Sequence, residues 1–297
     1  MSDPGIVASE NTSILAPPAS RPRWKAWLLR LTIVLAVIYL TWVLIFLAGQ
    51  EFLIFYGANR WSPAPSGPSD PAIERWWHEF APEQRVEAWF QLGRGRSPDS
   101  PGPAVVFFHG NRDGVDTRWY VAKPWVEDGV SILAVEYRGY VRSAGLPSEP
   151  ALIDDSIAFI DRLAQRPEID KSRIIYQANS LGGGVALGVA QTHPPRALIL
   201  ESTFTNIPDV VDRSGIPPFL CRHTFRNDQR IAKVTCPILI SHGKNDWLIP
   251  FKHAQRLQRA APHAELVSFD GGHVDYQPNW PAIRSFLQKH GLRETSQ

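Results

Sequence analysis

The sequence has few cysteines, little net charge and no histidine cluster, and each shortage narrows what the protein can be. Its 297 residues include two cysteines and nine histidines, and the formal net charge is only +2. So small a surplus of positive charge gives no electrostatic reason to expect a nucleic acid as the partner. The histidines are scattered without the spacing of metal ligands, so we expect neither a metal ion nor another cofactor.

The two cysteines, Cys221 and Cys236, allow at most one disulfide bond. In an oxidising compartment this bond would close a loop of about 15 residues and stabilise the fold by roughly 3 kcal/mol. The alternative is a pair of separate thiols, with Cys236 a small buried residue at the start of a strand. The sequence alone leaves both alternatives open.

Charge is missing altogether from the 20 residues Leu31–Gln50, LTIVLAVIYLTWVLIFLAGQ. As a helix rising about 1.5 Å per residue, this run spans roughly 30 Å, the thickness of a bilayer's hydrocarbon core. Basic residues are concentrated before it, which predicts a cytoplasmic N-terminus and the bulk of the chain on the non-cytoplasmic side. The basic residues before the run are Arg21, Arg23, Lys25 and Arg30. Within ten residues after the run, Arg60 is the only basic residue.

A buried helix and a cleaved signal peptide both fit this apolar run less well. A buried helix of a soluble domain does not match, because the segment is apolar on all faces and precedes the domain. A cleaved signal peptide has a shorter apolar region and a small-x-small cleavage site, of which Ala48-Gly49 is only a poor version. We therefore predict a single-pass transmembrane helix that is not cleaved.

The composition, with 44% hydrophobic and 20% charged residues, is that of a globular protein with a substantial core. We expect a disordered N-terminal tail over residues 1–22, the transmembrane anchor over 23–56 and a Pro- and Ser-rich linker over 57–75. The remaining residues, 76–292, form one predicted domain.

Within this domain, strand-like apolar runs alternate with helical patterns, which predicts an α/β fold with a doubly wound, mainly parallel sheet. The alternation lapses over about residues 203–234, and this stretch is predicted to form a small cap over the carboxyl ends of the strands. The expected strands are Val86–Phe90, Ala104–Phe108, Ser131–Val135, Ile174–Gln177, Ala197–Leu200, Pro237–Ser241 and Glu265–Phe269.

One of these strands leads into a serine surrounded by small residues, Asn179-Ser180-Leu181-Gly182-Gly183. A strand, a sharp turn and a helix with a serine at the apex form a nucleophile elbow, which exposes the hydroxyl at the carboxyl end of the sheet. The usual pattern is G-x-S-x-G, and here Ala178 replaces the first glycine. We expect this methyl group to be tolerated, because the position requires small size.

A serine hydroxyl needs an imidazole to take its proton and a carboxylate to orient that imidazole. Asp246 and His273 each follow a later strand, and they give the chain order Ser, Asp, His that is typical of such elbows. We therefore predict Ser180, Asp246 and His273 as a catalytic triad. Glu201, at the end of an earlier strand, is the alternative acid.

The other acids and histidines near the strand ends have simpler interpretations. Asp270 and Asp275 lie too close to His273 in sequence to orient it easily, and we expect them to be turn residues. His109 and His242 are expected to hydrogen-bond to loop backbone rather than to transfer protons.

The tetrahedral intermediate of acyl transfer needs hydrogen-bond donors for its negatively charged oxygen. We expect one from the backbone N–H of Leu181, at a helix N-terminus where the dipole also favours negative charge. The second is expected from the backbone N–H of Asn111, in the turn after the strand Ala104–Phe108.

Seven motifs spread over about Trp89 to Leu287 carry a resemblance to a known family. They are His109-Gly110-Asn111, Tyr137-Arg138-Gly139-Tyr140, Gly145-Leu146-Pro147-Ser148-Glu149, Asn179-Ser180-Leu181-Gly182-Gly183, Leu200-Glu201-Ser202-Thr203-Phe204, His242-Gly243 with Asp246, and Gly272-His273. Together they resemble the α/β-hydrolase superfamily. Within it, the match is to the abhydrolase-domain serine hydrolases, which include membrane-anchored depalmitoylases and lysophospholipid or monoacylglycerol lipases. Val141 departs from the pattern, because it replaces a glycine in the Arg-Gly loop.

The resemblance implies an α/β-hydrolase fold with Ser180 as nucleophile, Asp246 as acid, His273 as base, and Asn111 and Leu181 at the oxyanion hole. It also implies a membrane-anchored serine hydrolase that cleaves carboxylic esters or thioesters through an acyl-enzyme. Its partners would be a small-molecule or lipid-like ester and the bilayer. Two alternatives remain: a catalytically silent hydrolase fold that serves as a binding or scaffolding module, and a serine peptidase of the same fold.

Overall fold

The computed structural model describes residues 23–59, 67–273 and 277–292. The predicted tail over residues 1–22, the centre of the predicted linker and Asp275 lie outside these ranges. The chain divides into two units, residues 1–45 and 46–297. The boundary falls within one long helix, α1 (Arg23–Ile54), which is followed by a short 3₁₀ helix, η1 (Tyr56–Asn59).

Helix α1 is long and apolar enough to cross a membrane. The stretch Trp24–Ile54 has a mean hydropathy of 2.7, and its apolar side chains up to Ile45 are mostly exposed. One apolar N-terminal helix was predicted and is present. A signal sequence near the N-terminus can also form an apolar helix, so the helix by itself does not separate a membrane span from a signal.

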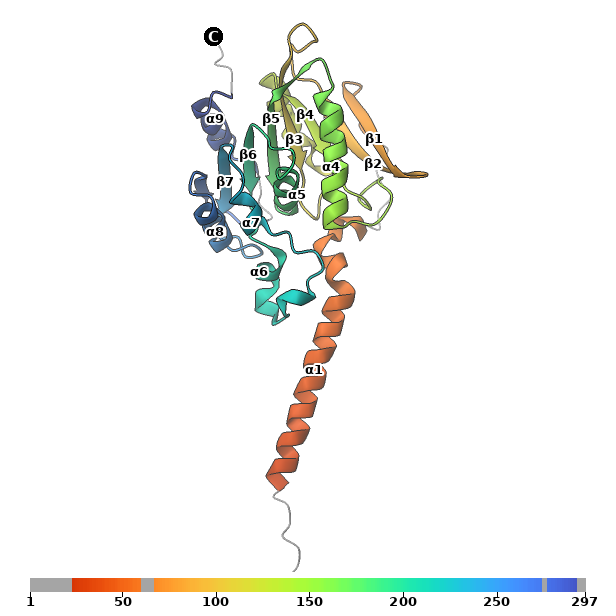
Figure 1. The fold of residues 1–297 in the computed structure, drawn as a ribbon, viewed down its shortest axis with the longest axis vertical. Helices are drawn as coiled ribbons and strands as arrows, with labels where there is room; N and C mark the ends of the chain where they lie inside the picture. Colours follow the sequence, from red (N-terminus) through yellow and green to blue (C-terminus); the bar gives the residue numbers. More distant parts are fainter. Residues whose placement is uncertain (1–22, 60–66, 274–276, 293–297) are drawn as a thin grey trace, which may run out of the picture. The chain divides into compact units, whose positions relative to one another are not determined.

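An eight-stranded sheet forms the centre of the second unit (Figure 1). Its strand order is β1-β2-β4-β3-β5-β6-β7-β8; β2 runs antiparallel to its two neighbours, and all the other pairs are parallel. The prediction of a doubly wound, mainly parallel sheet is confirmed. The strands are β1 (Ile73–Ala81), β2 (Gln84–Gln91), β3 (Gly102–Phe108), β4 (Ser131–Val135), β5 (Ile169–Asn179), β6 (Ala197–Glu201), β7 (Ile238–Gly243) and β8 (Glu265–Phe269).

Strand β1 begins at Ile73, inside the stretch expected as linker. It is an edge strand, and its charged residues Glu74, Arg75 and Glu79 suit an edge more than a core. Trp76 nevertheless points inward, where its ring stacks on Phe90 of β2 at a centroid distance of 4.9 Å. The domain therefore starts a few residues earlier than the sequence pattern indicates.

Helices cover both faces of the sheet, as in a doubly wound fold, and α4 and α5 lie in front of it in Figure 1. Helix α4 begins where the Ser148 hydroxyl accepts the N–H of Ala151 and Pro150 occupies the first turn, two standard start signals. The helices are α2 (Val115–Arg118), α3 (Ala122–Glu127), α4 (Glu149–Ala164), α5 (Leu181–Val189), α6 (Ile207–Val211), α7 (Asn227–Ile231), α8 (Lys252–Ala260) and α9 (Trp280–Lys289).

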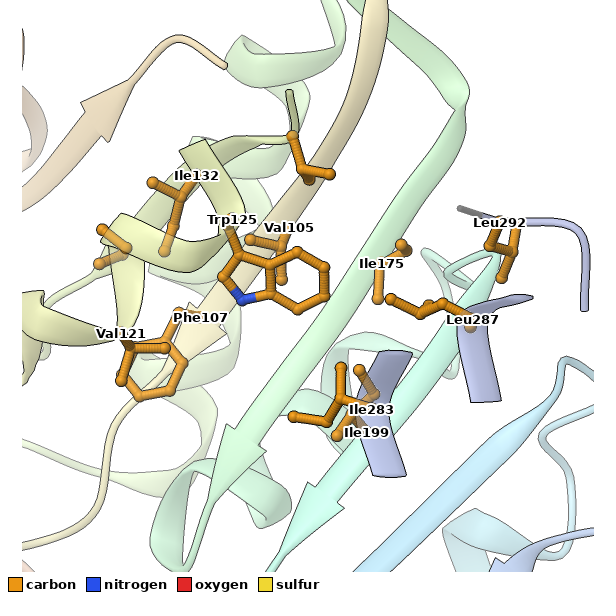
Figure 2. Close-up of a cluster of buried hydrophobic side chains, with 14 of the residues drawn as sticks. Val105, Phe107, Val121, Trp125, Ile132, Ile175, Ile199, Ile283, Leu287 and Leu292 are labelled. Carbon is orange, nitrogen blue, oxygen red and sulfur yellow. The ribbon is translucent and has the colours of Figure 1, made fainter. Parts of the chain in front are cut away.

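A large apolar cluster lies between the sheet and helices α3 and α9 (Figure 2). Trp125 of α3 and Ile283 of α9 pack there on inward-facing valines and isoleucines of the strands. The Trp125 indole N–H donates to the Gln177 side chain at 2.8 Å, so its polar atom is satisfied. This packing fixes the strands whose carboxyl ends carry the candidate site.

The stretch expected as a cap, residues 203–234, contains α6, α7 and two 3₁₀ turns, η3 (Asp212–Ser214) and η4 (Pro218–Leu220). Pro208 lies in the first turn of α6 and Pro218 in that of η4, positions at which proline is tolerated. Cys221 lies in this stretch, and both it and Cys236 are free thiols. The structure therefore has the separate thiols and not the disulfide.

Candidate active site

Ser180 lies at a sharp turn between β5 and α5. Its backbone has φ 51° and ψ −114°, a positive-φ conformation that residues other than glycine rarely adopt. The Ser180 N–H donates to the Glu201 carbonyl at 2.9 Å, and the Thr203 hydroxyl donates to the Ser180 carbonyl at 2.8 Å. These bonds hold the strained strand–turn–helix geometry of a nucleophile elbow.

Small residues let this elbow pack against the neighbouring strands. Ala178 is fully buried and lies in register between Phe108 and Leu200. A Cβ atom at Gly182 would collide with the carbonyl group of Phe108. Position 182 therefore requires glycine, whereas the alanine at position 178 is accommodated within the regular strand.

Three side chains from the ends of three strands form one chain of hydrogen bonds. Ser180 Oγ lies 3.1 Å from His273 Nε2, and His273 Nδ1 lies 2.7 Å from Asp246 Oδ2. Because a carboxylate only accepts, the imidazole carries its proton on Nδ1 and leaves Nε2 free to accept the serine proton. The structure thus brings the three predicted residues together, although Ser180 and His273 are 93 positions apart in sequence.

The carboxylate of Asp246 is buried and has further hydrogen-bond donors. The backbone N–H groups of Leu248 and Ile249 donate to Oδ1 at 3.0 and 2.7 Å, and His242 Nε2 lies 3.5 Å from Oδ2. Burial raises the pKa of this carboxyl, but the hydrogen bonds from His242, His273 and the Ile249 N–H outweigh it, so the pKa lies well below its ordinary value. Asp246 therefore stays ionised at neutral pH, as stabilisation of a histidinium requires.

The loop His109-Gly110-Asn111 follows β3 and is held through its carbonyl oxygens. The Tyr137 hydroxyl donates to the His109 carbonyl at 2.9 Å. The Gly110 carbonyl accepts from His109 Nδ1 at 2.8 Å and from the Asp113 N–H at 3.3 Å. In a trans peptide the C=O and N–H point in opposite directions. Fixing the Gly110 carbonyl therefore also fixes the direction of the Asn111 N–H.

A buried ion pair supports this loop from behind. His109 Nε2 lies 2.6 Å from Glu136 Oε1, and Glu136 Oε2 accepts from the Val115 N–H at 3.0 Å. Both ring nitrogens of His109 face acceptors, so both carry protons. Burial lowers the pKa of His109, but the charge and the hydrogen bond of Glu136 outweigh it and raise this pKa above its ordinary value. His109 thus hydrogen-bonds to the loop backbone, as expected, and its ring is positively charged.

The two predicted oxyanion donors have their N–H groups available. Within the described part of the chain, the backbone N–H groups of Asn111 and Leu181 donate to no acceptor. Both residues line a cavity that also contains Ser180. Leu181 is the first residue of α5, where the helix dipole favours negative charge. The arrangement can therefore stabilise an oxyanion that forms beside Ser180.

Two hollows of different character meet at Ser180 and Asn111. One has a volume of about 240 Å³ and apolar walls, to which Phe204, Ile207 and Leu248 contribute. The other, of about 230 Å³, has polar walls lined by His273 and by Asp113, Arg118 and Asn179. A molecule bound across both hollows would present an apolar part and a polar part on opposite sides of the serine.

The structure places the other candidate residues away from the histidine. The Glu201 side chain accepts from the Gln177 amide at 2.8 Å, inside the sheet. The Asp270 side chain is 86% exposed and lies 3.5 Å from Lys244. His242 Nε2 lies 2.8 Å from the Ile249 carbonyl oxygen, which is the loop-backbone contact expected for it. Among the described acids, Asp246 is therefore the one in contact with His273.

Two features of the site were not expected from the sequence. Glu136 was overlooked as the partner of His109, although a charged residue directly after a buried strand is a usable signal. Leu53 and Ile54 of α1 line the apolar hollow. They follow the polar residues Gln50 and Glu51 at the end of the apolar run, and their residue types alone do not assign them to a cavity.

In residues 23–59, 67–273 and 277–292 there is no group of three or more His, Cys, Asp or Glu side chains that could hold a metal ion.

Comparison with known sequences gives relatives over most of the chain. A family described as serine aminopeptidase, S33, matches residues 99–222. The uncharacterized protein Rv2307c of Mycobacterium tuberculosis is 32% identical, over 82% of this chain and 90% of that protein. The alpha/beta hydrolase domain-containing protein WAV2 of Arabidopsis thaliana is 28% identical, over 84% of this chain and 90% of that protein.

Comparison with solved structures gives the same fold at low sequence identity. Esterase 2 of Thermogutta terrifontis superposes with a TM-score of 0.62 and 17% identity, covering 78% of this chain and 98% of that one. An esterase of Pyrococcus furiosus superposes with a TM-score of 0.60 and 17% identity, covering 77% of this chain and 96% of that one. At this identity the likeness concerns the fold, and the chemistry has to be argued from the site.

Proposed function

Since this chain belongs to the α/β-hydrolase superfamily, we propose that it is a membrane-anchored serine hydrolase that cleaves carboxylic esters or thioesters. The observation that carries the proposal is the unbroken hydrogen-bonded chain from Ser180 through His273 to Asp246. It lies beside two free backbone N–H groups and a cavity large enough for a substrate.

In the proposed reaction, Ser180 Oγ attacks the acyl carbon while its proton passes to His273 Nε2. The carbonyl oxygen becomes an oxyanion, which the N–H groups of Asn111 and Leu181 stabilise. When the intermediate collapses, the bond to the leaving group breaks, and His273 returns the proton to that group. A water molecule then attacks the acyl-enzyme by the same route and releases the acid and free Ser180.

The two hollows suggest how the substrate is oriented. His273 has to reach the leaving group in order to protonate it, and His273 lines the polar hollow and not the apolar one. We therefore assign the leaving group to the polar hollow and the acyl chain to the apolar hollow. Ser180 and Asn111, which line both, would then lie at the scissile bond.

We also propose that α1 anchors the enzyme in a membrane, with a cytoplasmic N-terminus and the hydrolase domain on the other side. Its apolar stretch is longer than the apolar region of a signal peptide. The basic residues precede it, as the positive-inside rule requires for this orientation. A C-terminal alkaline phosphatase fusion should be active, and an inactive fusion would reverse the orientation.

The test of the chemistry is p-nitrophenyl ester turnover by the full chain in detergent micelles, with Ser180→Ala beside it. We expect turnover by the wild type and its loss in the variant, and equal rates would overturn the assignment. Reaction of Ser180 with a fluorophosphonate probe distinguishes the enzyme from a silent binding module, which would not react.

The match to an aminopeptidase family makes a peptidase the second candidate. An aminopeptidase needs an anionic group near the serine for the substrate's free ammonium. The acid in the polar hollow is Asp113, and Arg118 already neutralises it at 3.0 Å. We therefore favour esters, and faster turnover of aminoacyl p-nitroanilides than of p-nitrophenyl esters would reverse this order.

A further inference from the structure

The last turns of α1 belong to the catalytic unit. The division between the two units falls after Ile45, so residues 46–54 are grouped with the sheet and its helices. The side chains of Phe46, Gln50, Ile54 and the following Phe55 are buried, whereas those of the preceding turns are mostly exposed. The helix therefore changes from an exposed apolar rod to a packed element of the enzyme within its own length.

Gln50 joins these turns to the cap. Its side-chain amide donates to the Leu220 carbonyl at 3.2 Å, and its side-chain oxygen accepts from the Arg222 N–H at 2.9 Å. The next residue, Glu51, forms an ion pair with Arg222 at 3.0 Å. A buried amide that satisfies both a carbonyl and an N–H of one loop fixes the two segments against each other.

The same turns contact the loop that carries a proposed oxyanion donor. The Asn111 side-chain amide donates to the Leu53 carbonyl at 3.2 Å, and the Gly57 N–H donates to the Asn111 carbonyl at 2.6 Å. A Cβ atom at Gly57 would lie 2.8 Å from that carbonyl oxygen and would also overlap the Tyr140 ring. The approach is close enough to require glycine, so the end of α1 is positioned directly against the site.

Leu53 and Ile54 are thereby held at the wall of the apolar hollow. Ile207, Val210 and Val211 of the cap line the same cavity, and so does Ser180. Leu53 is 60% exposed although it lines the cavity, so it stands at an open rim where a long ligand would cover it. The size of the side chain at position 53 therefore sets how wide the cavity is at this rim.

We propose that Leu53 and Ile54 are specificity-determining residues, so that the anchor helix itself selects the acyl chain. This inference rests on the proposed serine hydrolase activity and deepens it. A short acyl group bound at Ser180 contacts the inner part of the cavity. A long one continues along the cavity and packs on α1, so the size of the side chain at position 53 changes the relative rates for long and short esters.

The test uses the full chain in detergent micelles and compares kcat/KM for p-nitrophenyl decanoate with that for p-nitrophenyl acetate. Leu53→Trp narrows the rim and should lower the decanoate-to-acetate ratio by about tenfold, the effect of a misfit of about one methylene group or more in an apolar pocket. Leu53→Ala widens the rim and should move the preferred acyl chain towards longer or bulkier groups. Opposite shifts from one position would not result from a general loss of stability.

Leu44→Trp is the matched control, because it makes the same substitution on an exposed leucine of the same helix that does not line the cavity. Its decanoate-to-acetate ratio should equal that of the wild type. If the wild type shows Ser180-dependent turnover while neither Leu53 variant changes the decanoate-to-acetate ratio relative to this control, the inference is overturned and the proposed function stands. If no ester gives Ser180-dependent turnover, the proposed function falls and the inference falls with it.

Discussion

Replacing Asp246 by asparagine changes the charge and hydrogen-bonding capacity of one buried atom in the proposed triad while keeping the side chain's shape. The remaining amide oxygen can take the place of Oδ1, which accepts from the backbone N–H groups of Leu248 and Ile249. The amide nitrogen then takes the place of Oδ2, which lies 2.7 Å from His273 Nδ1. Two donors would face each other at hydrogen-bond distance.

The imidazole relieves this conflict by moving its proton to Nε2, so that Nδ1 becomes an acceptor for the new amide. In this tautomer Nε2 no longer accepts from Ser180 Oγ, which lies 3.1 Å away. The nucleophile loses its base while the geometry stays intact. In the serine-protease triad the same substitution lowers kcat by about 10⁴-fold. At about 1.36 kcal/mol for each factor of ten, we expect a loss of about 5.5 kcal/mol of transition-state stabilisation.

The assay is kcat for p-nitrophenyl butyrate by full-length Asp246→Asn in detergent micelles, with thermal unfolding measured on the same sample. Asp270→Asn is the control, because it makes the same substitution on an exposed acid near His273 that contacts Lys244. Glu201→Gln tests the alternative acid and should cost far less, since Glu201 contacts Gln177. A folded Asp246→Asn variant with more than about a tenth of the wild-type kcat would refute this reasoning, as would an equal loss in Glu201→Gln.

Three further predictions concern stability. Gln50→Ala leaves a carbonyl and an N–H of the cap without their partner and should lower the free energy of unfolding by roughly 2–4 kcal/mol, seen as a lower melting temperature. The raised pKa of His109 gives stability that is complete below the unfolded-state pKa of about 6.5 and declines as pH rises through the folded-state pKa. The melting temperature should therefore fall above about pH 6.5, and less steeply in Glu136→Gln. Val141 has φ 48°, a strained value for a β-branched residue, so Val141→Gly should stabilise the fold by about 1 kcal/mol in thermal unfolding.

Matched substitutions separate these effects from general ones. Gln288→Ala removes an exposed glutamine amide from α9 and should leave the melting temperature unchanged, so an equal fall in both glutamine variants would contradict the role of Gln50. Val126→Gly replaces a half-buried valine within α3 and should destabilise by about 1 kcal/mol. Destabilisation in Val141→Gly as well would show that its backbone strain is offset by packing. If the melting temperature falls equally steeply with pH in the wild type and in Glu136→Gln, the His109–Glu136 ion pair is not the cause of that fall.

Much of the candidate site follows from the sequence because parallel strands end at a common edge. A residue that follows a strand within a few positions is placed near this edge, and this applies to Ser180, Asp246 and His273. Their meeting within hydrogen-bond distance was therefore expected from chain order, while their roles in catalysis stay predictions. The sequence also shows that Val141 stands where the family pattern has glycine, and the structure shows that the backbone of Val141 has a positive φ.

The contribution of α1 was not predictable from the sequence, for a physical reason. A helix that packs on protein along one stripe normally shows a polar stripe elsewhere, and this contrast marks the packed face. Residues 31–50 are apolar all round because the surrounding medium is expected to be apolar too, so no contrast marks where packing begins. The polar pair at the end of this run, Gln50 and Glu51, is understood only with its partners Leu220 and Arg222 in view.

The position of the unit boundary within α1 also determines what proteolytic release from a membrane would yield. A cut before Phe46 leaves the catalytic unit with Gln50 bound to the cap and Leu53 at the cavity. A cut between Ile54 and Gly57 instead removes Gln50, Leu53 and Ile54 from the catalytic fragment, while Gly57 stays bound to Asn111. Cleavage sites within one short segment would therefore release the domain with its complete cavity wall in one case and without part of that wall in the other.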